Sequence, residues 1–283
     1  MEKERNTGTR SPEDYVEPNC PISGKPLGTK QKKKRIPQQR VSQRLDELMA
    51  RKDYDGAERM LDYWLAEART LSDEQGEFMV HNEQMGFYRK RGLKDKAYKA
   101  IADGESMLDE LGYSDSVSGA TFYTNAATVY TAFGEAEKGL SRFEKAKDIY
   151  ESNITGNEFK LAGLYNNMAT ALVDMGNYRD ADVLFMQAVE TLKDCEASEL
   201  ETAVTYLNML DRQIAERGAG GVGKEEIDFY LETARDYLDA DTVKRDGYYS
   251  FMADKCVEIY RTLGWEDYAD ELSERIRMID ERA

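Results

Sequence analysis

The hydrophobic residues between positions 164 and 189 follow the spacing of two consecutive α-helices. Four of them stand at i, i+3, i+4 and i+7, which lines one face of a helix, and three more follow after a Gly-Asn pair at 176–177. The first stripe consists of Tyr165, Met168, Ala169 and Leu172, and the second of Ala181, Phe185 and Ala188. Because small residues alternate with rings, two helices can approach closely, and the segment predicts a helical hairpin.

The same arrangement occurs 42 residues upstream, with its small residues, rings and turn glycine in register. The corresponding residues are Tyr123, Ala126, Ala127, Tyr130, Gly134, Gly139, Phe143 and Ala146. A fixed period of this length predicts an array of stacked hairpins, in which each unit buries its apolar face against its neighbours.

These two copies resemble the tetratricopeptide repeat, in which helix A carries aromatic and small residues and helix B an Ala, Phe, Ala pattern. The period exceeds the ~34 residues usual for that family, which predicts helices longer by roughly two turns per hairpin. The resemblance implies an all-α fold, a right-handed superhelical solenoid of helix-turn-helix repeats. It also implies that the A helices line the concave surface of the superhelix.

Weaker copies extend the pattern over residues 41–283, the predicted solenoid domain. The predicted hairpins span about 41–72, 77–111, 120–155, 162–195, 203–240 and 250–283. Residues 1–40 contain prolines and many charges without helical periodicity, which predicts a disordered basic tail. Its run from Lys30 to Arg35 is compatible with a nuclear-import, nucleic-acid or acidic-surface contact, and equally with a solvated charge run.

Charge and hydropathy restrict the classes of partner. The chain has a net charge of -16, and because residues 1–40 carry a net positive charge, the solenoid is more acidic still. It should therefore repel nucleic acid and anionic membranes. No apolar run reaches the ~20 residues needed to span a bilayer, and the N-terminus has no apolar signal core, so we expect a soluble cytoplasmic protein. The cysteines, Cys20, Cys195 and Cys256, are far apart, and we expect reduced thiols.

No residue pattern predicts catalysis, a metal site or a cofactor. Residues 218–224 match the phosphate-binding pattern G-x-x-x-x-G-K, but Glu225 replaces the required Ser or Thr and the preceding segment has a helical pattern instead of a strand. The only histidine, His81, falls at the packing position of Tyr165, and a single imidazole forms no His-based metal cluster. The sequence thus predicts a protein that is not an enzyme, with no cofactor and no metal.

A column of polar residues stands two positions after the helix A ring position of five hairpins. Its members are Glu83, Asn125, Asn167, Asn208 and Lys255. At about 100° per residue, Asn167 points away from the apolar stripe of its own helix. Asn lowers helix propensity relative to Ala by up to ~0.7 kcal/mol, so three in one column suggest an offsetting role.

The neighbours of the column on the same face are also small or polar, namely Asn82, Thr124, Asn166, Thr128 and Thr170. A carboxamide donates and accepts hydrogen bonds, which suits pairing with the backbone of an extended peptide. One interpretation is therefore a peptide-binding groove. The other is structural, with the asparagines bonding across adjacent helices instead of to a ligand.

The main functional prediction is a non-enzymatic scaffold that binds a peptide segment of a protein partner in its concave groove. The alternative is an intracellular peptide-sensing receptor that resembles the bacterial pheromone sensors. The sensors that act as transcription factors carry an N-terminal helix-turn-helix, and the 40 N-terminal residues are too few and too irregular to supply one. The sequence makes no prediction of partner identity or oligomeric state.

Overall fold

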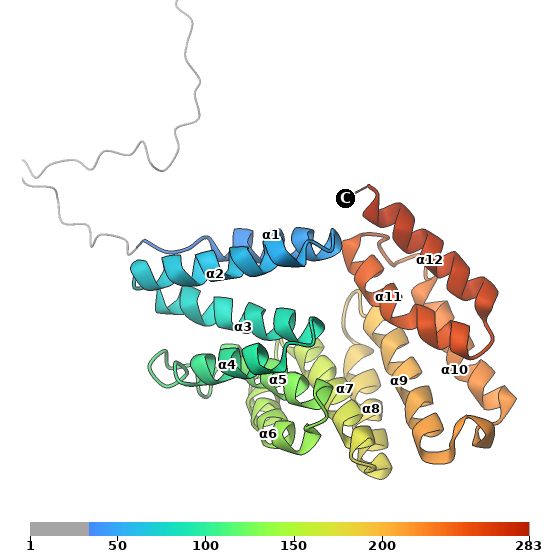
Figure 1. The fold of residues 1–283 in the computed structure, drawn as a ribbon. Helices are drawn as coiled ribbons and strands as arrows, with labels where there is room; N and C mark the ends of the chain where they lie inside the picture. Colours follow the sequence, from blue (N-terminus) through green and yellow to red (C-terminus); the bar gives the residue numbers. More distant parts are fainter. Residues whose placement is uncertain (1–33, 283) are drawn as a thin grey trace, which may run out of the picture.

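The computed structural model describes residues 34–282, and this part of the chain contains twelve α-helices and no β-strand. They form six consecutive hairpins of a helix A and a helix B (Figure 1). The hairpins are α1 (Gln38–Ala50) with α2 (Tyr54–Thr70), α3 (Glu74–Lys90) with α4 (Lys94–Glu105), α5 (Val117–Ala132) with α6 (Ala136–Ser152), α7 (Glu158–Asp174) with α8 (Tyr178–Leu192), α9 (Glu199–Arg217) with α10 (Lys224–Leu238), and α11 (Gly247–Thr262) with α12 (Glu266–Asp280).

The A helices form one continuous layer, because α1, α3, α5, α7, α9 and α11 each contact the next member of the series. The B helices α2, α4, α6 and α8 instead pack between their own helix A and the helix A that follows. Close spacing in the A layer and wider spacing in the B layer bend the stack, with the A helices on the inside (Figure 1). Within the described residues, no helix combines the length and the apolar character that spanning a bilayer requires.

The turns within the hairpins follow from backbone chemistry. Gly92, Gly134, Gly176 and Gly264 end helix A with positive φ angles of 68°, 75°, 75° and 84°, a region that glycine enters without steric cost. The first hairpin has Lys52 at this position, with φ 57°. The glycine that marks the repeat in the sequence is therefore a C-terminal cap of helix A.

The predicted tail of residues 1–40 is wrong at its C-terminal end, and residues 1–33 lie outside the described part of the chain. Ile36 is buried, its backbone N–H donates to Asp73 Oδ2 at 2.9 Å, and α1 begins at Gln38. Asp73 also caps α3 by accepting a hydrogen bond from the Gly76 N–H at 3.1 Å. Composition gives no sign of this anchor, because it depends on a carboxylate 37 residues further along the chain.

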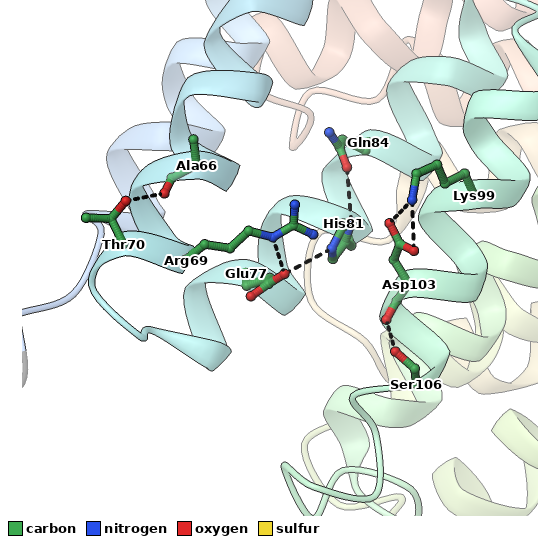
Figure 2. A network of polar contacts seen from close by, with 9 residues as sticks. All are labelled: Ala66, Arg69, Thr70, Glu77, His81, Gln84, Lys99, Asp103 and Ser106. Carbon is green, nitrogen blue, oxygen red and sulfur yellow. Dashed lines mark hydrogen bonds and ion pairs between the residues drawn. The ribbon is translucent and has the colours of Figure 1, made fainter.

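His81 occupies the packing position that the repeat alignment gives it. The side chain is buried on α3, and Nδ1 lies 3.1 Å from Gln84 Oε1 (Figure 2). This contact explains why a buried glutamine stands where most hairpins have a small or apolar residue. Glu77, which accepts from Arg69 Nε at 2.6 Å, comes within 3.7 Å of His81 Nε2.

Burial lowers the pKa of His81, against the opposing effects of Asp103, Gln84 and Glu77, and Arg69 lowers it further. The folded protein therefore binds a proton at this site less readily than the unfolded chain. The contribution of His81 to stability is complete above its unfolded pKa of about 6.5 and is lost as the pH falls through the lower folded value.

We expect the free energy of unfolding to decline less between pH 7 and pH 5 in His81→Gln than in the wild type. Burial raises the pKa of Glu83, Glu201 and Asp211, so these carboxyl groups add stability as the pH falls. The free energy of unfolding of the wild type therefore combines their effect with the opposite effect of His81. Urea unfolding of both proteins across this range isolates the histidine as a difference. If the free energies of unfolding of the two proteins changed in parallel with pH, the imidazole would bind protons equally in the folded and unfolded states.

The buried apolar residues form two clusters instead of one continuous core. The first extends from Ile36 to Ala188 and the second from Leu200 to Leu272, so the division falls between the fourth and fifth hairpins. Met209 of α9 packs against the first cluster, so apolar contact crosses this junction beside the polar contacts between α8 and α9.

Candidate functional site in the inner face

The inner face of the A helices surrounds a cavity of about 250 Å³. Six of the ten predicted site residues line it, from α5, α7, α9 and α11. They are Thr128, Asn166, Asn167, Thr170, Asn208 and Lys255. The other four, Asn82, Glu83, Thr124 and Asn125, lie on α3 and α5 and do not line this cavity.

The asparagines form two pairs that join the A helices of successive hairpins. Asn125 Nδ2 donates to Asn82 Oδ1 at 2.9 Å, between α5 and α3. Asn208 Nδ2 donates to Asn166 Oδ1 at 3.2 Å, between α9 and α7. Part of the column thus bonds across adjacent helices, as the structural interpretation requires.

The pairs leave much of the hydrogen-bonding capacity unused. A carboxamide has two N–H donors and an oxygen with two lone pairs, and each pair uses one donor and one lone pair. Within residues 34–282, Asn167 makes no side-chain hydrogen bond; it is half-buried and lines the same cavity as the two asparagines of the second pair. Asn167 is therefore the member of the column whose amide is open to a ligand.

The threonines of the same face donate to their own helices. Thr124, Thr128 and Thr170 each donate from Oγ1 to the backbone oxygen four residues earlier, at 2.8, 2.8 and 3.0 Å. Their hydroxyl protons are engaged, but the oxygen lone pairs can still accept. The donors available to a ligand in the cavity are consequently the asparagine amides and Lys255.

The two charged members of the column lie in different surroundings. Glu83 accepts a hydrogen bond from Ser42 Oγ of α1 at 2.7 Å, and burial raises its pKa despite this bond. Lys255 lines the cavity, with Nζ 4.2 Å from the centre of the Phe251 ring and 3.4 Å from Met252 Sδ. Burial lowers the pKa of Lys255, and the nearby Arg89 and Lys90 lower it further.

Sequence reasoning missed several residues of this face. Thr131, Val204, Leu207, Cys256 and Ile259 also line the cavity. Thr131 stands three positions after Thr128 and was available from helical spacing. The apolar members were not predicted as site residues, because spacing alone does not distinguish a buried residue from one that lines a cavity.

The turn that matches a phosphate-binding pattern joins two helices. α9 ends at Arg217, a short 3₁₀ turn covers Ala219–Gly221, and α10 begins at Lys224. An ion pair of 2.6 Å between Arg217 and Glu226 closes the turn. Among the described residues, no group of three His, Cys, Asp or Glu side chains is placed to hold a metal ion.

Comparisons with solved structures establish the fold. The chain is similar to BtubC (BKLC) from P. vanneervenii, with 18% sequence identity, a TM-score of 0.59 and coverage of 70% of this chain and 78% of that one. It is also similar to the nearly identical TPR-like repeats of a putative kinesin light chain from Podosopora anserina, with 15% identity and a TM-score of 0.46 over 71% of this chain and 94% of that one. No family model matches the sequence, and no curated protein matches it.

The predicted all-α repeat solenoid is confirmed, and with it the resemblance to the tetratricopeptide type of fold. At this level of identity, the likeness concerns the fold alone. The function has to be argued from the inner face of this chain.

Proposed function

We propose that this solenoid is a protein-interaction module whose inner face binds an extended peptide segment of a partner. The observation that carries the proposal is the cavity lined by six sequence-predicted polar residues, among them a half-buried asparagine with an open amide. The resemblance to tetratricopeptide-type folds supports a non-catalytic role, because such repeats present extended concave surfaces to other proteins.

The size and chemistry of the cavity favour part of a peptide over a whole small molecule. Small-molecule sites usually measure ~300–1,000 Å³, and the cavity of about 250 Å³ is smaller. Asn167 would pair with a backbone N–H and C=O of the ligand, while Val204, Leu207 and Ile259 offer apolar contact to one side chain. Backbone pairing of this kind accepts many sequences, so neighbouring groups must supply specificity.

We expect Asn167→Ala to weaken peptide binding without lowering stability. The amide has no partner within the described residues, so its loss leaves no unpaired group in the free protein. A lost ligand hydrogen bond of about 1 kcal/mol corresponds to a roughly fivefold rise in Kd. Peptides selected on the wild type from a displayed library of random dodecapeptides serve as the probe, with Kd measured by fluorescence anisotropy.

Gln187→Ala is the matched control, because it removes a carboxamide from an exposed position on the outer helix α8. This variant should bind the selected peptides as the wild type does. Asn125 and Asn208 are poorer probes, since each donates to another asparagine and its removal also weakens helix packing. Equal binding by Asn167→Ala and Gln187→Ala, or the failure of the library to yield any peptide, would contradict the proposal.

A further inference from the structure

Two lysines from distant hairpins converge on one aromatic ring at the inner face. Lys90 Nζ lies 5.8 Å from the centre of the Phe251 ring, and Lys255 Nζ lies 4.2 Å from the same centre. Lys90 ends α3 in the second hairpin, whereas Phe251 and Lys255 belong to α11 in the sixth. The curvature of the solenoid therefore brings together side chains that are more than half the chain apart (Figure 1).

These cations lack counterions within the described part of the chain. No carboxylate oxygen there lies within ion-pair distance of Arg89, Lys90 or Lys255, although the whole chain has 55 acidic residues and a net charge of -16. Glu201 is the carboxylate that acts most directly on Lys255, and it already accepts the hydroxyl of Tyr248. Two unpaired lysines beside the same ring form a local concentration of positive charge on an otherwise acidic protein.

The surroundings of the cluster increase the cost of this arrangement. Burial lowers the pKa of Arg89, and burial lowers that of Lys255, with Arg89 and Lys90 acting in the same direction and Cys256 and Glu201 against it. Arg89, Lys90 and Lys255 are exposed residues, so water screens part of their mutual repulsion, and an anion placed between them would remove more of it. A bound anion would relieve this repulsion, so the unliganded protein is prepared for negative charge at this point.

Building on the proposed peptide groove, we propose that Lys90 and Lys255 bind an acidic side chain of the partner peptide. Phe251, half-exposed beside them, would contact an apolar residue next to that carboxylate. Lys255 also lines the cavity with Asn167, so the charged site continues directly into the site for the peptide backbone.

The choice of an acidic peptide over a polyanion rests on charge. A nucleic acid or an anionic membrane presents many negative charges to a strongly acidic solenoid and is repelled at long range. A peptide with one or two carboxylates experiences little of this repulsion and can reach the two lysines. Because these cations come from both core clusters, a bound carboxylate would also connect the two ends of the stack.

The experiment uses the dodecapeptide library and compares the wild type with the double variant Lys90→Gln/Lys255→Gln. We expect Asp and Glu to be enriched among peptides selected by the wild type and not among those selected by the variant. An acidic wild-type peptide should bind the variant roughly tenfold more weakly, as for the loss of a charge-assisted hydrogen bond. Lys244→Gln, which removes a charge from an exposed loop, should keep both the enrichment and the affinity.

The outcomes separate this inference from the proposed function. Peptides that bind through Asn167 but show no acidic enrichment, or the same enrichment in the double variant, would overturn the acidic site alone. A library that yields no peptide would overturn both. Lys90→Arg/Lys255→Arg keeps the charges and should restore acidic selection, whereas a merely structural role for the lysines predicts no such rescue.

Discussion

We expect Gly119→Ala to lower the free energy of unfolding by about 2–3 kcal/mol, although alanine is the better helix former. Gly119 lies in the first turn of α5, and a Cβ atom there would stand 2.0 Å from the backbone oxygen of Tyr113. That oxygen is fixed, because it accepts from both the N–H and the hydroxyl of Ser116, each at 3.0 Å. The added methyl group must therefore displace backbone, which costs more than the propensity gain of up to ~1 kcal/mol.

Gly86→Ala is the matched control for this prediction. Gly86 lies inside α3, and a Cβ atom there would meet nothing within 4 Å. The substitution should therefore stabilise the protein by up to ~1 kcal/mol through helix propensity and the reduced freedom of the unfolded chain. Urea unfolding measures both variants, and equal effects of the same sign would refute the close contact at Gly119.

The contrast between these glycines shows what the repeat pattern can and cannot predict. Apolar spacing predicted the burial of Tyr165, Ala169 and Phe185, because a period of 3.6 residues places them on one face whatever the tertiary context. Gly119 has no such signal, since Leu161 stands 42 residues later at the same point of the repeat. Position 119 requires glycine because the loop before α5 passes close to it. The path of that loop depends on contacts that the local sequence does not specify.

The candidate site was predictable to a similar degree. Helical spacing placed Asn166, Asn167 and Asn208 on the inner face, and the structure brings them to one cavity. Their pairing depends on the register between hairpins, and the approach of Lys90 to Phe251 depends on a curvature that accumulates over the intervening repeats. Small rotations at each hairpin decide such contacts, so a one-dimensional pattern does not contain them.

The junction between the fourth and fifth hairpins depends on one buried arginine. Arg212 of α9 lies 2.5 Å from Asp182 of α8 and 2.5 Å from Glu216 of its own helix. Its guanidinium stands 5.4 Å from the centre of the Tyr178 ring, and the Tyr178 hydroxyl donates to the Ala215 backbone oxygen at 3.2 Å. These polar contacts join the halves of the stack where the two apolar clusters divide, beside the apolar contact that Met209 of α9 makes with the first cluster.

Arg212→Met should weaken that coupling by about 2 kcal/mol. Removing one partner of a buried ion pair costs about 3–5 kcal/mol, but the side chains of Asp182 and Glu216 are 39% and 42% exposed and water compensates part of the loss. Methionine keeps the aliphatic contacts of the arginine stem, so the change isolates the charge and its hydrogen bonds. Arg217→Met is the control. Arg217 ends the same helix and forms a more exposed ion pair with Glu226.

The two tryptophans allow this coupling to be measured at each end. Trp64 of α2 packs against the first cluster, and Trp265, the N-cap of α12, packs against the second, so Trp265→Phe and Trp64→Phe backgrounds report each half separately. In a stack of repeats, stability is the sum of unit and interface terms, and a weakened interface separates the unfolding of its two sides. We therefore expect the urea transitions reported by Trp64 and Trp265 to coincide in proteins with Arg212 and to separate in Arg212→Met. Coincident transitions in the variant would show that apolar packing alone couples the halves.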